Sequence, residues 1–528
     1  MKLAHTQQGT VQGTTATVDG TLVHRFLGIP YAAPTGGQRF RPPVPAPAWP
    51  GIRDAAGPGP AAPQNPDLQA PPGSTPRRWS EDCLNLNVWT PESGAGSDRP
   101  VLVWVHGGAY LSGANSDAMY DGGALAAAAG AVVVAVNYRL GALGFLHLPE
   151  LLGPEYADSS HVGLLDILAA LRWVRRNIAG FGGDPQNVTV FGESAGAAAI
   201  GTVLGMPASD GLFRRAVMQS GTAERYRTPA DSARLTTEFL SLCGLDSGSA
   251  AGLLDFPVAE LLAAQEKLVQ RTAASSYAVP LPFQPTVGTP ALPRPPLEAV
   301  RAGLNGGVDL LIGTNLNEGS FSVQLRPDNP AGPAFTDRVA SVLAGAGIPR
   351  AHAAGYAEAL GRVHAAAPGA APASDGKVLL EAAIADSVYR QPSNRLLAAR
   401  EEWAGSAAAG TVPGRNHAYL FTWPSPAMGG RLGSCHALEI AFVFRHLNSP
   451  ESAFLTRGTA PQALGDTMSS AWAAFAATGI PVLPGAEWPE YGAQRATVVL
   501  DADVSVAIDP RREIREFFEA ATAGQLEG

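Results

Sequence analysis

Asn187-Val188-Thr189-Val190-Phe191-Gly192-Glu193-Ser194-Ala195-Gly196-Ala197-Ala198-Ala199 is the stretch of this chain that decides its fold. A β-branched run leads into a serine with glycine two positions before and two positions after it, and small residues that favour a helix follow. Such glycines are needed where a serine stands on a tight turn between a strand and a helix, because side chains there would collide with neighbouring elements. The stretch therefore predicts a nucleophile elbow, which holds Ser194 at the carboxyl end of a strand and over the positive end of a helix.

Apolar runs typical of strands buried on both faces recur along the chain. They occupy residues 101–105, 131–136, 188–191, 216–218 and 309–312. Helical stretches lie between them, most clearly at 164–177. In the early segments 9–23 and 83–90, apolar and polar residues alternate as they do in antiparallel strands. The pattern predicts an α/β fold, with a large, mostly parallel central sheet, helices on both faces and an antiparallel N-terminal portion.

The chain has 528 residues, of which 46% are hydrophobic, so it is long enough to bury a large core. Proline-rich stretches at 41–76 and 280–296 resemble linkers in composition. Because strand-like runs flank both and none of the pieces is self-sufficient, we expect one domain over residues 1–528 with long loop insertions. No apolar run approaches the roughly 18 residues needed to span a bilayer, so we expect no interaction with a membrane.

Charge and cysteine content restrict the class of partner. The net charge of −9 and the scattered arginines disfavour a nucleic-acid binder, so a small-molecule substrate is expected, with the protein a monomer or small homo-oligomer. Cys83, Cys243 and Cys435 match no metal-cluster spacing and are predicted to be reduced thiols. Residues 1–8 lack the apolar core of a secretion signal. We therefore expect a cytoplasmic protein that uses no metal or cofactor.

Chemistry is expected where the strands end, because ligands of open α/β sheets bind at the carboxyl ends of the strands. The run 101–105 is followed there by His106-Gly107-Gly108-Ala109-Tyr110. A glycine-rich turn can point its backbone N–H groups at an approaching oxygen. Together with the N–H of Ala195, such groups would stabilise the oxyanion of an acyl-transfer reaction.

A serine nucleophile needs a histidine base, and five histidines follow Ser194. They are His352, His364, His417, His436 and His446. The first two lie in helical stretches, and the third precedes a strand-like run at 419–423, which leaves His436 and His446. We favour His436, because it lies in the loop 433–436 downstream of that strand.

The histidine in turn needs a carboxylate that fixes its tautomer and stabilises its cation. Between Ser194 and His436, Glu318 lies just past the end of the buried run 309–312. Asp309 stands at the start of that strand and Asp386 lies in a helical stretch. Position therefore favours Glu318.

Longer motifs around these residues resemble the type-B carboxylesterases, the cholinesterase and para-nitrobenzyl esterase branch of the α/β-hydrolases. Two segments match the signatures of that family, namely 181–196, which includes Phe181-Gly182-Gly183-Asp184-Pro185 and the elbow, and Glu81-Asp82-Cys83-Leu84-Asn85-Leu86-Asn87-Val88. Further matches are Gly28-Ile29-Pro30-Tyr31-Ala32, Trp104-Val105-His106-Gly107-Gly108-Ala109, Asn137-Tyr138-Arg139-Leu140-Gly141, Gln219-Ser220-Gly221 and Asn317-Glu318-Gly319. The resemblance extends from about residue 8 to residue 520.

The resemblance implies a role for each matching position. Ser194 would be the nucleophile, Glu318 the acid and His436 the base. The oxyanion donors would be the N–H groups of Gly108, Ala109 and Ala195, and the supporting residues would be Gly107, Glu193 and Ser220, the last with its hydroxyl near the acid. Structural ion pairs are implied between Arg39 and Glu81 and between Arg139 and Asp166.

The function expected from these features is that of a serine carboxylesterase, which hydrolyses small to medium, mainly uncharged carboxylic esters through an acyl-enzyme intermediate. One alternative is a carbamate or aryl-amide hydrolase with the same triad. Another is a non-catalytic, cholinesterase-like binding module, and a lipase acting at lipid surfaces is a third. Phe283 and Phe321 lie in the region of the acyl pocket, although either suits the core equally well.

Overall fold

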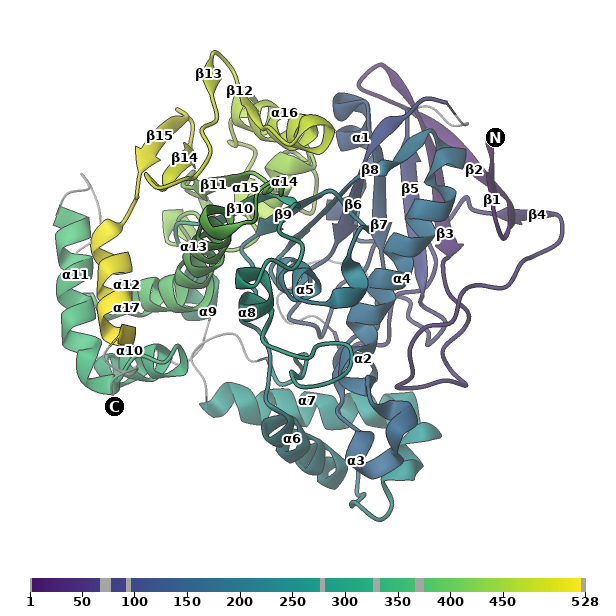
Figure 1. The fold of residues 1–528 in the computed structure, drawn as a ribbon, viewed down its shortest axis with the longest axis horizontal. Helices are drawn as coiled ribbons and strands as arrows, with labels where there is room; N and C mark the ends of the chain where they lie inside the picture. The colour runs from purple at the N-terminus through teal and green to yellow at the C-terminus, as the bar shows by residue number, and fades with distance from the viewer. Residues whose placement is uncertain are drawn as a thin grey trace.

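The structure, a computed structural model, describes residues 2–66, 77–91, 96–275, 281–325, 333–365 and 375–523. At its centre is a large twisted sheet, whose strands come from all along the described chain (Figure 1). In spatial order the strands are β1 (Lys2–Thr6), β2 (Gly9–Val18), β3 (Thr21–Pro30), β5 (Asn85–Thr90), β7 (Val132–Val136), β6 (Arg99–Val105), β8 (Gly183–Glu193), β9 (Arg215–Gln219), β10 (Asp309–Asn315), β11 (Asn416–Phe421), β14 (Ala496–Leu500) and β15 (Ser505–Ile508), with β4 (Ile52–Asp54) beside β2.

Strand directions divide this sheet into two parts. From β1 through β2, β3 and β5 to β7, neighbouring strands are antiparallel. From β7 through β6, β8, β9, β10 and β11 to β14 they are parallel, and β15 returns antiparallel. The predicted fold class, mostly parallel with an antiparallel N-terminal portion, is confirmed.

Both faces of the sheet are buried, as the continuous apolar runs require. Along β6, Val101, Val103 and Val105 pack into one apolar cluster, and Leu102 and Trp104 pack into another. The helices α4 (Val162–Asn177) and α5 (Ala195–Leu204) cover the first face, and α1 (Gly123–Ala129), α14 (Ile440–Val443) and α16 (Gln462–Thr478) cover the second. The site at the strand ends therefore rests on a rigid two-sided core.

A third apolar cluster lies outside the sheet (Figure 1). It is built by α10 (Pro333–Gly345), α11 (Ala353–Ala365), α12 (Gly376–Ile384) and α17 (Arg512–Ala523). A π-helical turn, Ala385–Arg390, joins α12 to α13 (Gln391–Ser406) and leads back towards β10. The other helices and strands are α2 (Gly141–Phe145), α3 (Pro149–Leu152), α6 (Pro229–Leu242), α7 (Val258–Ser275), α8 (Pro296–Arg301), α9 (Ser320–Gln324), α15 (Ala453–Thr456), β12 (Val482–Leu483) and β13 (Ala486–Glu487).

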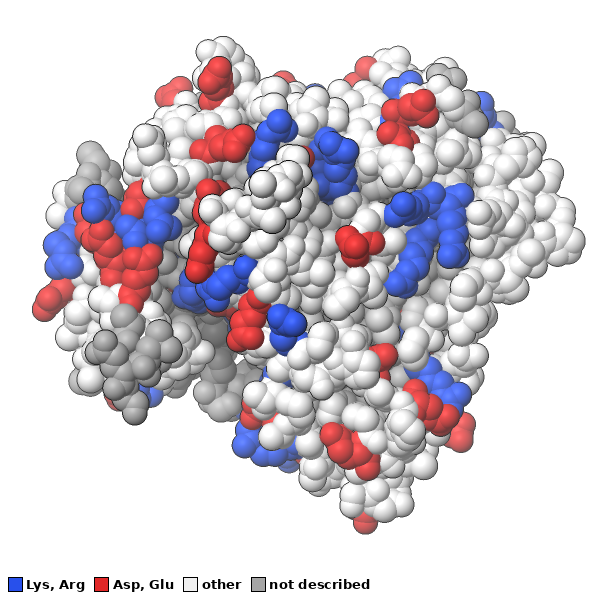
Figure 2. All heavy atoms as spheres, viewed as in Figure 1, with Lys and Arg blue, Asp and Glu red and all other residues white. Residues whose placement is uncertain are grey.

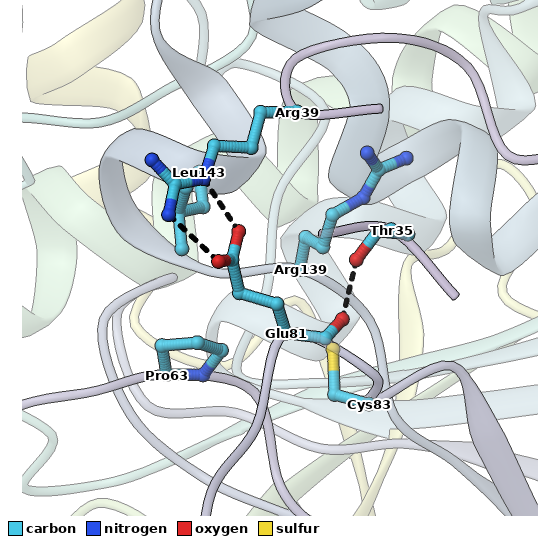
Figure 3. A pocket seen from close by; sticks show the side chains of 7 residues that line it. All are labelled: Thr35, Arg39, Pro63, Glu81, Cys83, Arg139 and Leu143. Carbon is cyan, nitrogen blue, oxygen red and sulfur yellow. Dashed lines mark hydrogen bonds and ion pairs between the residues drawn. The ribbon is translucent and has the colours of Figure 1, made fainter. Parts of the chain in front are cut away.

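The two expected structural ion pairs are present. Arg39 binds Glu81 through two nitrogens, each 2.7 Å from a carboxylate oxygen, and Arg139 Nη2 lies 2.7 Å from Asp166 Oδ1. Figure 3 shows the first pair beside Arg139 and Cys83 in a small pocket. All three cysteines are free thiols, and burial raises the pKa of Cys83.

The surface carries charges of both signs. Figure 2 shows acidic and basic side chains interspersed on the face in view, with a small basic group over α4, the helix of Arg172, Arg175 and Arg176. Across the described ranges, every helix falls short of the length and apolarity that a membrane span demands.

Candidate active site

Ser194 stands on a strained turn between β8 and α5. Its backbone has φ 54° and ψ −121°, a conformation that costs energy for a residue with a side chain and that concentrates at functional sites. A Cβ at Gly196 would lie 2.0 Å from the carbonyl oxygen of Val105, and one at Gly192 would lie 2.6 Å from the same atom. Both flanking glycines are therefore required by the close approach of β6 to this turn.

The turn after β6 lies directly beside the serine. A Cβ added at Gly107 would be 3.1 Å from Ser194 Cβ. Positive φ angles at Gly108 (106°) and Ala109 (58°) redirect the backbone there. Within the described part of the chain, the N–H groups of Gly108, Ala109 and Ala195 donate to no acceptor, and the last is also free because it opens α5. Three unpaired donors thus come from the two segments that flank Ser194.

Glu318 and His436 meet because they follow two neighbouring parallel strands, β10 and β11. His436 Nδ1 lies 2.6 Å from Glu318 Oε2, and the other carboxylate oxygen accepts the N–H of Asn315 at 2.7 Å. The two loops are also joined directly, since Asn317 N–H donates to the carbonyl of Ser434. Glu318 is buried, with 2% of its surface exposed, so its carboxylate is committed to this bond.

The second ring nitrogen of His436 faces Glu193, the neighbour of Ser194 in sequence. Nε2 lies 3.1 Å from Glu193 Oε1, and no hydrogen bond joins it to Ser194 Oγ in the described structure. Burial raises the pKa of Glu193 to about 8. Nε2 therefore faces the carboxyl group of Glu193, while Nδ1 is bonded to Glu318.

Charge around His436 favours its protonated form. Burial lowers the pKa of this histidine, but Tyr389, Glu193 and Glu318 outweigh that effect and hold the pKa well above its usual value. The imidazolium is the form that a histidine takes after it has accepted a proton from a serine. The environment therefore stabilises the state that a general base reaches.

Several residues of the site had no predicted role. The Tyr389 ring lies 4.9 Å from the His436 ring and arrives on the π-helical turn. Glu439 accepts bonds from Asn315 Nδ2 at 2.6 Å and Gln219 Nε2 at 3.1 Å. The position of Glu439, three residues after His436, is a sequence signal that could have identified it as a site residue. The position of Tyr389 depends on tertiary packing.

Other predicted positions have different surroundings. Ser220 is buried near the elbow with φ 55°, and its hydroxyl forms no hydrogen bond to Glu318 within the described residues. Phe283 packs in the core against Phe239, and Phe321 lies partly buried against the second cluster. His417 does not precede the strand, as expected, but lies inside β11, which starts at Asn416, three residues before the run predicted at 419–423.

The carboxylesterase family profile matches residues 1–515. The chain belongs to this family. The para-nitrobenzyl esterase of Bacillus subtilis (strain 168) is 36% identical over 520 residues, which cover 98% of each chain. The fumonisin B1 esterase of Sphingopyxis macrogoltabida is 34% identical over 504 residues, 92% of this chain and 84% of the relative. A solved PNB esterase structure superposes with a TM-score of 0.82 at 34% identity, covering 98% of this chain and 99% of the other.

This carboxylesterase is accordingly a carboxylic ester hydrolase with the α/β-hydrolase fold. The non-catalytic and amide-hydrolase alternatives receive less support than the esterase interpretation. In the described ranges, no group of three or more His, Cys, Asp or Glu side chains is arranged to hold a metal ion.

Proposed function

We propose that this carboxylesterase hydrolyses small to medium carboxylic esters with Ser194 as nucleophile, His436 as base and Glu318 as the acid that orients the base. The observation that carries the proposal is the convergence of three features. A strained serine, three unpaired N–H groups and a histidine bonded to a buried carboxylate all lie at the carboxyl edge of the sheet.

In the proposed reaction, His436 takes the hydroxyl proton of Ser194 as its oxygen attacks the ester carbonyl. The N–H groups of Gly108, Ala109 and Ala195 hold the resulting oxyanion. His436 then gives its proton to the leaving alcohol, and water attacks the acyl-enzyme by the same route. For these steps to occur, His436 Nε2 must turn from Glu193 towards Ser194 when substrate binds, because the site without substrate has no hydrogen bond between Nε2 and Ser194 Oγ.

Hydrolysis of p-nitrophenyl acetate, butyrate and octanoate by the wild type, Ser194→Ala and Ser247→Ala tests this proposal. Ser247 is an exposed serine well after Ser194 in the sequence, and it serves as the matched control. We expect kcat of Ser194→Ala to fall by about 10⁴-fold or more with an unchanged melting temperature, and Ser247→Ala to behave as wild type. A Ser194→Ala variant that kept most of the rate would refute the assignment.

The same triad could in principle cleave carbamates or aryl amides. Matched ester, carbamate and anilide substrates separate these activities, and we expect the ester to be hydrolysed fastest because alkoxides leave more readily than amines. We further propose that residues 1–528 act as a single domain in the cytoplasm, without nucleic-acid partners and as a monomer or small homo-oligomer. The free thiols and the mixed surface charge support this view.

A further inference from the structure

The turn after β6, residues 106–113, presents two of the three proposed oxyanion donors and is closed at its base. The N–H of Ser112 donates to the carbonyl of Gly108 at 3.0 Å. Gly113 follows directly and packs against the start of the turn, because a Cβ added to it would lie 2.7 Å from the carbonyl oxygen of Gly107. The position of Gly113 therefore helps to determine the shape of the whole turn.

Gly113 is held by the side-chain amide of Gln64. Its N–H donates to Gln64 Oε1 and its carbonyl accepts a bond from Gln64 Nε2, both at 3.0 Å. Among the described residues, Gly113 has no other hydrogen-bond partner. Gln64 lies in the proline-rich stretch 41–76, which we expected to be a loop insertion. A side chain of this loop thus holds the backbone of the turn 106–113.

The amide of Gln64 is itself fixed in one orientation. Nε2 gives its second proton to the carbonyl of Ala62 at 2.9 Å, and Oε1 accepts a second bond from Arg77 Nη1 at 3.1 Å. A glutamine amide has two donor protons and two acceptor lone pairs, so all four positions are used. Because Gln64 is buried, its amide cannot turn without leaving polar groups unpaired inside the protein.

An ion pair connects Arg77 to the residues that follow the turn. Arg77 binds Asp117 through Nε at 2.7 Å and through Nη2 at 2.9 Å, a two-bond arrangement with a fixed geometry. Asp117 Oδ2 also accepts the N–H of Ala114, the neighbour of Gly113, at 3.3 Å. Gln64, Arg77 and Asp117 therefore close a ring of bonds at the base of the turn 106–113.

The placement of oxyanion donors matters because hydrogen bonds weaken steeply with distance and angle, and a small displacement of a group in an active site can cost much of the rate. We propose that Gln64 is a positioning residue for catalysis. By fixing Gly113, it holds the turn in the shape that aims the N–H groups of Gly108 and Ala109 at the reacting carbonyl oxygen. This role rests on the proposed function, since it matters only if those N–H groups bind the oxyanion.

Two ketone inhibitors test this role in the full-length protein. Ser194 Oγ can add to the activated carbonyl carbon of 1,1,1-trifluorohexan-2-one, with its proton passing to His436, and this gives a tetrahedral oxyanion. Hexan-2-one has a similar size but stays a ketone. The ratio of the two competitive inhibition constants therefore measures oxyanion binding, and it does not depend on how much of the protein is folded. We would measure both constants with p-nitrophenyl butyrate as substrate for the wild type, Gln64→Met and Asn177→Leu.

Asn177→Leu is the matched control. Asn177 is also a buried amide that joins backbone groups, since it accepts the N–H of Gln7 at 2.7 Å and donates to the carbonyl of Trp173 at 3.0 Å. It is the last residue of α4 and precedes the start of β8, whereas Ser194 follows the other end of that strand. Both substitutions replace a buried amide with an apolar side chain of similar size, but only Gln64→Met does so at the turn 106–113.

We expect Gln64→Met to weaken binding of the trifluoromethyl ketone by about tenfold or more and binding of hexan-2-one by less than about threefold, because only the first inhibitor places charge at the displaced N–H groups. Asn177→Leu should leave the ratio unchanged even if it lowers the melting temperature. Should Gln64→Met not fold, Gln64→Glu keeps the acceptor for Gly113 and Arg77 and loses only the donor. It should still change the ratio by about threefold or more.

An unchanged ratio in the folded Gln64 variant would overturn the positioning role. So would an equal change in Asn177→Leu, which would mean that the loss of any buried amide has this effect. The wild type shows which proposal fails. A wild type that binds both ketones equally well would remove the proposed function, whereas a strong wild-type preference for the trifluoromethyl ketone that Gln64→Met retains would remove the role of Gln64 alone.

Discussion

His436 lies between two carboxyl groups that have different hydrogen-bond partners. Glu318 receives a backbone N–H and the Nδ1 bond, both of which suit a carboxylate. Glu193 has no hydrogen-bond donor aimed at its Oε1 apart from the histidine contact, and burial raises its pKa to about 8. The two acids on one ring thus have different surroundings, and we expect Glu318 to orient the base and Glu193 to bound its Nε2 side.

Replacing Glu318 by Gln tests the orienting role. The change removes the negative charge that stabilises the imidazolium and can present an N–H to Nδ1, which favours the wrong tautomer. We expect kcat to fall by about 10²- to 10⁴-fold. Glu439→Gln is the comparison, since Glu439 is equally buried but bonds Asn315 and Gln219 instead of the histidine, and its loss should be at least about tenfold smaller. Equal losses would remove the distinction between the two acids.

Glu193 predicts a pH dependence of stability. Its pKa is about 8 in the folded chain against a usual 4.5, so between these values the folded chain keeps a proton that the unfolded chain has lost. This group therefore lowers the free energy of unfolding as pH rises from about 5 to 8, and the decrease is complete above 8. Urea unfolding of the wild type and Glu193→Gln at pH 5, 6, 7 and 8 should show the wild type losing stability relative to the variant. Parallel curves would contradict the raised pKa.

At the scale of elements, the elbow depends on close contact between β6, β8 and α5. We expect Gly196→Ala to destabilise the fold by about 3 kcal/mol or more, because its Cβ would lie 2.0 Å from the carbonyl of Val105. Gly361→Ala is the matched control. It lies in α11 with nothing within 4 Å of the added Cβ, so it should stabilise by roughly 0.5 to 1 kcal/mol. Chemical unfolding checks both, and a tolerated Gly196→Ala would contradict the packing.

Sequence periodicity predicted which elements carry the candidate site, but it predicted the bounds of these elements less well. The apolar run at 188–191 marks only the later part of β8, which starts at Gly183 and passes through polar residues at 184–187, where the register with β6 shifts. The π-helical turn has no period that distinguishes it from the helices around it. Because Tyr389 reaches His436 only through that turn, its role could not be read from the pattern.

At the scale of the molecule, the peripheral helices are tied to the acid loop by buried charges. Arg390 donates to the carbonyls of Asn315 and Leu316 at 2.9 and 3.0 Å, and it pairs with Asp386. Arg511, just before α17, reaches the same aspartate at 3.4 Å. The third cluster therefore supports the segment that presents Glu318.

Free thiols predict that the stability of the whole molecule is independent of reductant. Cys83 and Cys435 are buried and unpaired, and Cys243 is partly buried and unpaired. We expect the melting temperature to be the same with and without dithiothreitol in differential scanning fluorimetry. A fall on reduction would show a disulfide that the structure lacks.

Motifs predicted Ser194, Glu318 and His436, because strand ends and tight turns constrain residue type locally. The contact between Glu193 and His436 could not be predicted, because it joins segments far apart in sequence.

Titration with diethyl p-nitrophenyl phosphate tests most directly whether Ser194 is the nucleophile. This reagent transfers a diethylphosphoryl group to an activated serine, and the bound group leaves the enzyme only slowly. Released p-nitrophenol, residual esterase activity and the labelled residue, located by tandem mass spectrometry, would be measured on one sample. We expect one equivalent to abolish activity and the diethylphosphoryl group to be on Ser194. Complete inactivation with the group on any other residue would contradict this expectation.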